Sequence, residues 1–157
     1  MKTFFLIVAV LSFQLVTAQS TEISGSYDKI GKFVNGVAFV HKNGLVGLIN
    51  TQGKEVIKPE YEKIDYFGKD NVAYTWKNGL VGLIDINGKV IIDNIYEQIG
   101  HFKGNQAIVK KDGLSGVVDK SGKILVDVKY NKLSCEANGV IKAVNPDGTE
   151  VLVIPNK

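Results

Sequence analysis

The chain repeats one pattern of polar turn residues and apolar strand residues. An Asn-Gly or Asp-Gly pair precedes a short apolar run, and an Asn or Asp then stands three residues before a further glycine. The copies span residues 42–53, 77–88 and 111–122. Asn-Gly and Asp-Gly tolerate positive φ at both central positions of a type I′ turn, whose twist matches that of the strands it joins. The pattern therefore predicts a tight β-hairpin in each copy.

A second, wider turn is expected after each hairpin. Its first residues are Asn50, Asp85 and Asp119. Asx at the first position and glycine at the fourth favour a type I turn, and the glycine is able to form a bulge. β-branched residues follow at 55–57, 90–92 and 124–126, which suits a half-buried strand. One unit is thus predicted to be a three-stranded meander, with bulges or close packing at the strand glycines Gly47, Gly82 and Gly116.

A ladder of aromatic residues recurs with the same period. Its tyrosines are Tyr27, Tyr61, Tyr96 and Tyr130, and its phenylalanines are Phe33, Phe67 and Phe102. We expect Tyr61 and Tyr96 in the core of the repeats with Phe67 and Phe102 beside them, because apolar residues keep a fixed spacing to both. An aromatic platform for a sugar or a peptide is the alternative. The segment that joins each tyrosine to its phenylalanine is compatible with one helical turn or with an irregular crossover.

The period of the repeat separates two architectures. Repeats are expected at approximately 27–60, 61–95 and 96–129, with a partial one at 130–157. Such units are short for a propeller blade, which typically has about 40–45 residues. We therefore favour an all-β, open, twisted array of β-meanders, with a small propeller-like closure as the alternative. Residues 21–23 match the phase of a third strand, and residues 151–154 match a second strand after Asp147-Gly148, so a ring would let the first strand complete the last sheet.

The repeated motif resembles the WG-repeat family, also called KWG repeats. The matching pattern is Asn-Gly-Leu-x-Gly-Leu-Ile-Asp/Asn-x-x-Gly-Lys followed by tyrosine, isoleucine and phenylalanine, from about Tyr27 to Ile154. The slot of the namesake tryptophan holds Val46, Val81 and Ser115. With valine in this slot, Val81 is expected to be only partly buried. The resemblance implies an all-β repeat module and no particular activity, because such repeats are mostly of unassigned function.

The N-terminal residues 1–18 have the order of a secretory signal peptide. Lys2 precedes an unbroken apolar run at residues 4–11, and Val16-Thr17-Ala18 supplies the small residues of a cleavage site. The run is too short to span a bilayer. Cleavage after Ala18 leaves residues 19–157 as a single predicted domain, enough to bury roughly two-thirds of its surface. We expect an exported protein, periplasmic or extracellular, without a transmembrane segment in the mature chain.

Composition narrows the expected partners. All 19 basic residues are lysines, and the formal net charge is only +3. Arginine supplies the fork geometry that reads bases and phosphates, so its absence argues against nucleic acid. The lysines beside the turns are Lys42, Lys54, Lys77, Lys89, Lys111 and Lys123. Solvated turns and protected sheet edges explain them, and an anionic envelope partner is the alternative.

The side chains with reactive groups do not form a recognisable site. His41 and His101 lack metal-ligand spacing with each other and with Cys135, which is expected to be a small buried hydrophobe. The segment 85–88 lacks the later ligands of a calcium loop. Acidic residues are scattered singly, and the serines Ser24, Ser115 and Ser121 lack a glycine elbow. We therefore assign no catalytic residue, no metal ligand and no cofactor.

These patterns together predict a non-enzymatic β-repeat protein. It would bind or scaffold an envelope or extracellular protein or glycan, through residues that the sequence leaves unassigned. A small glycan-binding, lectin-like module is the first alternative, and it requires exposed aromatic side chains on one face. A hydrolase without a recognisable motif is the second alternative, and it requires convergent polar groups.

Overall fold

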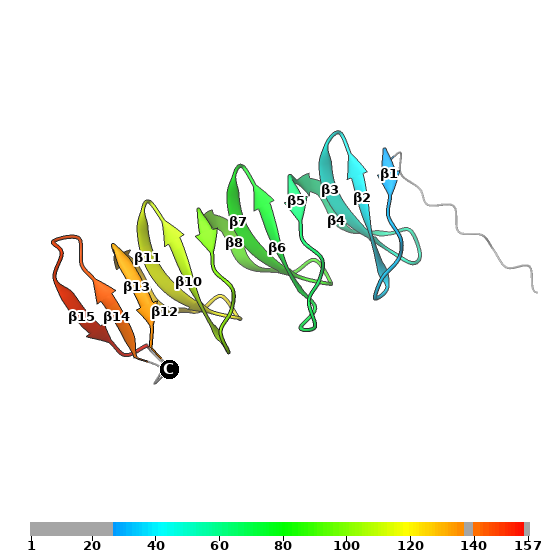
Figure 1. Ribbon diagram of the computed structural model, residues 1–157. Helices are drawn as coiled ribbons and strands as arrows, with labels where there is room; N and C mark the ends of the chain where they lie inside the picture. The colour runs from blue at the N-terminus through cyan, green and yellow to red at the C-terminus, as the bar shows by residue number, and fades with distance from the viewer. Residues whose placement is uncertain (1–26, 137–139, 156–157) are drawn as a thin grey trace, which may run out of the picture.

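Four antiparallel β-sheets follow one another along the chain in a computed structural model that describes residues 27–136 and 140–155 (Figure 1). We call them sheets A to D in chain order. Within each sheet the strands are neighbours in the order in which they occur in the chain. All regular elements in the described part are strands. The all-β prediction is therefore confirmed.

The first three sheets have four strands each and the last has three. Sheet A contains β1 (Lys29–Ile30), β2 (Val37–Lys42), β3 (Leu45–Asn50) and β4 (Glu55–Tyr61). Sheet B contains β5 (Lys63–Ile64), β6 (Val72–Lys77), β7 (Leu80–Asp85) and β8 (Val90–Tyr96). Sheet C contains β9 (Gln98–Ile99), β10 (Gln106–Lys111), β11 (Leu114–Asp119) and β12 (Ile124–Tyr130). Sheet D contains β13 (Lys132–Cys135), β14 (Ile141–Val144) and β15 (Glu150–Val153).

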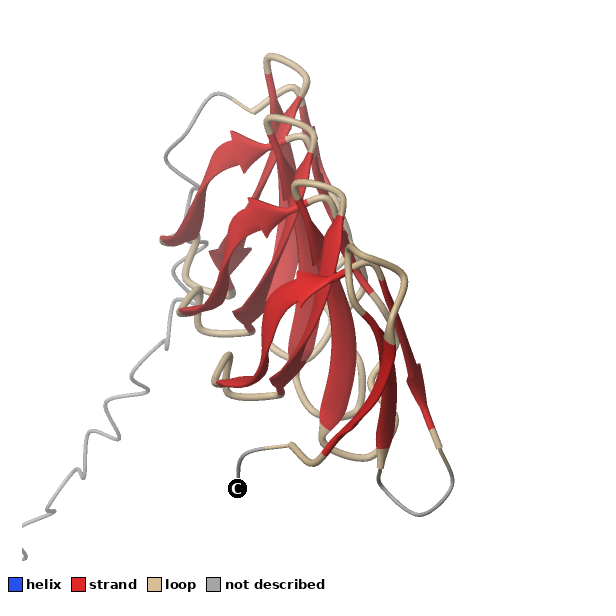
Figure 2. Cartoon of the chain, turned by 90° about the vertical axis from the view of Figure 1, so that its left-hand side faces the viewer, coloured by secondary structure: helices blue, strands red, loops and turns tan. Residues whose placement is uncertain are grey.

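The sheets form an open row. Figure 1 shows them side by side from β1 at one end to β15 at the other, and Figure 2 shows the hairpin loops one behind another along one edge. In the described part of the chain, the substantial contacts between elements of different sheets join consecutive sheets, as between β3 and β5 or between β7 and β9. The open array is therefore confirmed over the ring. The predicted signal peptide and the expected strand at 21–23 lie outside the described residues.

The tight turns have the predicted conformation. In sheet B, Asn78 and Gly79 take φ angles of 54° and 71°. Lys77 then pairs with Leu80 directly across the turn, as a two-residue type I′ loop requires. In each of these turns, a backbone N–H group also donates to the carboxylate of the residue that follows a ladder tyrosine. The Gly79 N–H, for example, donates to Glu62 Oε2 at 3.2 Å.

Each of the first three units is a four-stranded meander rather than the expected three-stranded one. The additional strand is short and lies in the segment after the ladder tyrosine, where β5 pairs Ile64 with Thr75 of β6. This segment is therefore not helical: it is a two-residue strand followed by residues 65–67, which belong to no regular element. In the first unit a second Asn-Gly turn, Asn35-Gly36, returns the chain into β2 with φ angles of 51° and 84°. The third predicted strand is also longer than expected, because β8 continues to Tyr96.

The wide turns are held by one side-chain oxygen each. Asp119 Oδ1 accepts the N–H groups of Ser121 and Lys123 at 2.8 and 2.9 Å, and the Gly122 N–H donates to the Asp119 carbonyl. Asn50 and Asp85 do the same in their units.

The last hairpin differs from the prediction. Its turn is of this wide type rather than a tight Asp-Gly turn, because Asn145 N–H bonds to the Thr149 carbonyl and Pro146 occupies the second position.

The core lies between consecutive sheets. Leu83 and Ile92 of sheet B pack with Ala107 and Val118 of sheet C. Val81 belongs to the same cluster and is 6% exposed, which corrects the expectation that it is only partly buried. Its slot faces the next sheet rather than solvent. Cys135 is exposed, again contrary to expectation, because it is the last residue of β13 and lies beyond the cluster that buries Leu133.

Glycine permits the sheets to approach closely. A Cβ atom on Gly88, in the wide turn of sheet B, would lie 2.7 Å from the Val56 carbonyl oxygen of sheet A. A Cβ atom on Gly82 would lie 2.6 Å from the Ile92 carbonyl oxygen, beside a register shift between Val81 and Leu83. The strand glycine therefore marks both a bulge and close packing, as predicted.

At the far end of the row, Lys142 pairs with Glu150 at 2.7 Å on sheet D.

Candidate functional site: a groove between the first two sheets

A groove of about 690 Å³ separates sheets A and B on the side of the short strands. One wall is the segment from Lys29 to Val34, and the opposite wall is the segment from Glu62 to Phe67. Val37, Phe39 and His41 of β2 line it between these walls. Each wall continues from a strand of only two residues, β1 in sheet A and β5 in sheet B.

Three aromatic rings form the apolar centre of the groove. Phe39 of sheet A and Phe67 of sheet B stack with ring centroids 6.3 Å apart. Tyr66 meets the Phe39 ring edge-on at 5.6 Å. Phe39 and Phe67 are partly buried against the core between sheets A and B, whereas Tyr66 is 88% exposed. A tyrosine that remains so exposed beside two apolar rings is available to an incoming ligand.

The two walls of this groove differ in how their charged side chains are paired. On the sheet B wall, Lys63 Nζ lies 2.7 Å from Asp65 Oδ1 and 4.2 Å from the centre of the Trp76 ring. Glu62 is engaged by the tight turn at Gly79. On the sheet A wall, Lys29 and Lys32 have no carboxylate within ion-pair distance among residues 27–136 and 140–155. The groove thus offers, beside its aromatic centre, two ammonium groups that are unpaired within the part of the chain that the structure describes.

The next interface has a smaller groove, about 260 Å³, between sheets B and C. Tyr74 occupies the slot of Phe39, and its hydroxyl donates to the Gly100 carbonyl at 3.1 Å across the interface. The Lys120 ammonium of sheet C pairs with Asp70, which precedes β6 of sheet B, at the same groove. The hydrogen bond and charge of Lys120 hold the pKa of Asp70 below its usual value. Asp70 comes from a loop one residue longer than its counterpart in the first unit.

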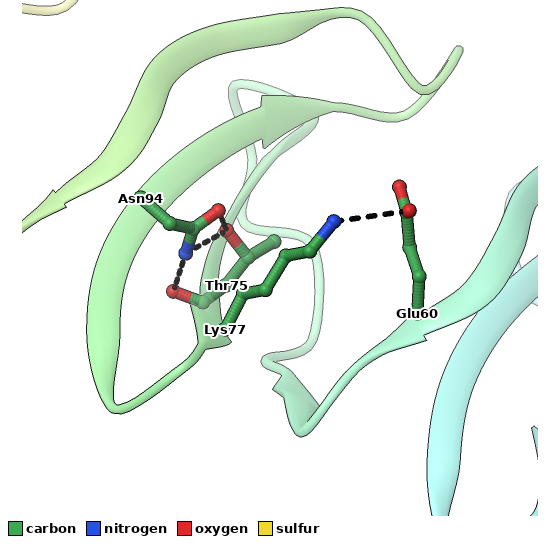
Figure 3. A network of polar contacts seen from close by, with 4 residues as sticks. All are labelled: Glu60, Thr75, Lys77 and Asn94. Carbon is green, nitrogen blue, oxygen red and sulfur yellow. Dashed lines mark hydrogen bonds and ion pairs between the residues drawn. The ribbon is translucent and has the colours of Figure 1, made fainter.

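A network of hydrogen bonds in sheet B joins Asn94 of β8 to Thr75 of β6 (Figure 3). Asn94 Nδ2 donates to the carbonyl oxygens of Thr75 and Leu80, both at 3.0 Å, and Thr75 is fully buried. Sheets A and C hold Val40 and Val109 in the slot of Thr75. Lys77 also reaches back to sheet A, 3.0 Å from Glu60 Oε2. Every polar atom of the Asn94 amide thus has a partner, so the network stabilises the sheet rather than presenting groups to a substrate.

The aromatic ladder is mostly a packing feature. Tyr61 and Tyr96 are each 5% exposed and lie in the clusters between sheets, as predicted. Burial raises the pKa of both phenols, with the charge of Glu60 as a further cause at Tyr61. Phe67 and Phe102 pack partly buried against the same clusters, but Phe33 is 42% exposed. The ladder tyrosines of sheets A to C are therefore not a platform for a ligand.

The lysines beside the turns do not converge. Lys77 is paired with Glu60 and lies 5.6 Å from the centre of the Tyr61 ring. Lys54 and Lys89 donate backbone N–H groups to the wide turns and their side chains are exposed. The positions of the lysines beside the turns fit a role in protecting the edges of the sheets.

The two histidines face different grooves. His41 lines the groove between sheets A and B, and His101 lines the smaller groove. Within residues 27–136 and 140–155, no three His, Cys, Asp or Glu side chains are placed to hold a metal ion. In the same part of the chain, no helix is long and apolar enough to cross a membrane.

Sequence reasoning missed Tyr66 and the whole groove. Tyr66 stands one residue before the ladder slot of Phe67 and has no tyrosine counterpart in the other units. The available signal was this departure from the repeat. An aromatic residue that breaks the period and is not needed for packing is a candidate for recognition.

Three comparisons bear on the family of the chain. A family model for the WG containing repeat matches residues 23–45, 47–80, 82–114 and 116–148. No curated protein matches the chain. Among solved structures, the crystal structure of the computationally designed Ika4 protein aligns with 18% identity and a TM-score of 0.36, over 89% of this chain and 100% of that chain.

Proposed function

The chain belongs to the WG-repeat family, and from this premise we propose that it is an exported, non-enzymatic β-repeat protein that binds or scaffolds another envelope or extracellular component. The observation that carries the proposal is the groove between sheets A and B. It has an aromatic centre and, on one wall, two lysines that have no ion pair among the described residues. Such a concave apolar site with a few polar groups is the usual form of a binding site.

The acidic side chains support binding over hydrolysis. Asp28, Glu62 and Glu97 accept backbone N–H groups of the tight turns, at 2.7, 3.2 and 3.2 Å. Asp85 and Asp119 accept those of the wide turns. A general acid or base needs a carboxylate aimed at a substrate, whereas these carboxylates are occupied by the fold.

Export is supported by residues 1–18. The charged start, the apolar run and Val16-Thr17-Ala18 have the order of a signal peptide. We propose cleavage after Ala18, with residues 19–157 as the mature repeat domain in the periplasm or outside the cell.

The proposal is tested by locating the protein and then its partner. The full chain is expressed with its own N-terminal segment, cells are fractionated, and the N-terminus is sequenced by mass spectrometry. We expect exported material that begins at Gln19. The mature protein, immobilised, is then incubated with envelope and cytosolic extracts, and each captured component is tagged and used for reciprocal capture.

Two results would contradict the proposal. One is folded protein that stays in the cytosol with Met1 intact. The other is turnover of an envelope peptide, ester or glycan by the mature protein, which would favour the hydrolase alternative. Reciprocal capture of one envelope component without turnover would support a binding or scaffolding role.

A further inference from the structure

We infer that the groove between sheets A and B binds an extended acidic segment of a partner protein and takes a bulky apolar side chain of that segment against Phe39 and Tyr66. The inference deepens the proposed binding function and rests on it. It specifies where the partner binds and which chemistry the partner has. The repeat fold alone specifies neither.

The centre of the groove fits an apolar anchor. Phe39 and Phe67 stack from opposite sheets, and Val46 and Ile64 lie beside them. Tyr66, exposed at the edge of these rings, would cover an inserted side chain without any rearrangement of the core. Binding energy at interfaces concentrates on one or two such anchors in apolar pockets. The volume of about 690 Å³ leaves room for the neighbouring residues of a segment.

The sheet A wall determines the charge of the partner. Lys29 and Lys32 line the groove and have no carboxylate partner in the described part of the chain. Lys63, on the opposite wall, is already compensated by Asp65. A segment with carboxylates on one side of its anchor would supply the missing counter-charges, and complementary charge increases association rate and specificity.

The groove is open through specific differences between the units. Phe39 lacks the hydroxyl with which Tyr74 bridges the second interface. Ile86 takes the slot of Lys120, and the first unit lacks the loop residue that corresponds to Asp70, so no ion pair forms there. The same repeat therefore builds a bridged interface between sheets B and C and an unbridged, aromatic groove between sheets A and B.

A peptide fits these groups better than a sugar. The hydroxyl groups of a sugar need several acceptors as well as donors. The groove carboxylates Glu62 and Asp65 already accept from Gly79 N–H and pair with Lys63. Within the described part of the chain, the two ammonium groups on the sheet A wall have no carboxylate partner, so they match carboxylates, and the apolar centre matches an apolar side chain.

The test uses fluorescein-labelled synthetic peptides and the mature protein in fluorescence anisotropy. One peptide alternates pairs of Asp with single Phe or Leu residues. In its two controls, Lys replaces each Asp or Ser replaces each Phe and Leu. We expect binding of the acidic apolar peptide alone, weakened by added NaCl because exposed charges are screened.

The variants separate charge from packing. Lys29→Glu with Lys32→Glu should weaken binding by about tenfold or more, since two attractions become repulsions. Tyr66→Ser should weaken it without loss of fold, because Tyr66 is 88% exposed. The matched control is Lys132→Glu, at the corresponding slot two residues after Tyr130 in sheet D, where affinity should stay within about twofold. Circular dichroism confirms that each variant is folded.

The inference is overturned if no peptide binds, if the Lys peptide binds as well as the Asp peptide, or if the double lysine variant keeps full affinity. Oligosaccharides that bind through Tyr66 but not through the lysines would identify a glycan site instead and would also overturn it. Failure of peptide binding together with reciprocal capture of an envelope partner would leave the proposed function standing. Peptide binding by a protein that stays in the cytosol would support the groove and contradict export.

Discussion

Val81 lies directly opposite Tyr96 across the β7–β8 pair. The same pairing joins Val46 to Tyr61 in sheet A and Ser115 to Tyr130 in sheet C. The slot that holds the namesake tryptophan of the family is thus the cross-strand neighbour of the ladder tyrosine. Both members of each pair are buried, and cross-strand pairs of this kind stabilise sheets. The two strongest repeat features of the sequence are therefore one structural unit.

This pairing predicts opposite effects for two substitutions at one slot. Val81→Ser should lower the free energy of unfolding by roughly 1–3 kcal/mol, because a hydroxyl replaces buried methyl groups beside Tyr96. Ser115→Val should raise it by about 1 kcal/mol, because Ser115 is buried beside Tyr130 in a slot that elsewhere holds valine. Urea unfolding followed by circular dichroism measures both. Val46→Ser is the matched control and should behave like Val81→Ser; a stabilising Val81→Ser would refute the pairing argument.

Local turn chemistry made much of the fold predictable. Asn78-Gly79 dictates positive φ at adjacent residues, and Asp85 with Gly88 dictates the wide turn, so neither depends on distant contacts. The extra strand was missed because β5 is two residues long and has no apolar run. A signal for it existed in the first unit, since Asn35-Gly36 is the same dipeptide as the recognised turns.

The groove was not predictable in the same way. It depends on Phe39 of one sheet meeting Tyr66 and Phe67 of the next, and the distance between two sheets is set by packing rather than by any local motif. The burial of Val81 and the exposure of Cys135 also depend on which residues have a sheet in front of them. Periodicity identifies equivalent slots, but it does not show where the row of sheets ends.

The glycine contacts between sheets predict unequal costs for one substitution. Gly79→Ala meets open space and should cost roughly 1–2 kcal/mol for positive φ alone. Gly88→Ala also has positive φ, and its Cβ would lie 2.7 Å from the Val56 carbonyl oxygen, so crowding should add roughly 1–3 kcal/mol. Thermal and urea unfolding of the two variants compare them. Equal midpoints would mean that sheets A and B do not approach closely at Gly88.

The phenylalanine slot of the ladder predicts a difference between the first and third units. Phe102 packs against the core between sheets B and C, so Phe102→Ala should cost about 2–3 kcal/mol, below the range for a fully buried ring. Phe33 is 42% exposed at the end of the row, and Phe33→Ala should cost less than about 1 kcal/mol. Unfolding midpoints of the pair decide the matter. Similar losses from both variants would contradict the exposed position of Phe33.

The wide turn of sheet C predicts a specific dependence of stability on pH. The Ser121 hydroxyl, 2.6 Å from Asp119 Oδ1, together with the N–H groups of Lys123 and Ser121, holds the pKa of Asp119 below its usual value. A carboxyl whose pKa is lower in the folded state stabilises the fold above its unfolded pKa of about 3.9 and loses that contribution as the pH falls through the folded value. The parent protein should therefore lose stability in acid partly through this turn.

Asp119→Asn isolates this contribution, because Asn50 holds the same slot in sheet A and accepts the Gln52 and Lys54 N–H groups at 3.0 Å. The amide keeps the acceptor and removes the titration, so urea midpoints plotted against pH should fall less steeply below about pH 4 than those of the parent. Ser121→Ala should also flatten the curve, since it removes the donor that holds the pKa of Asp119 down. Parent and Asp119→Asn curves that superimpose at every pH would show that this carboxylate is not linked to folding. A Ser121→Ala curve that matches the parent while Asp119→Asn flattens would instead assign the linkage to the backbone N–H groups of the turn.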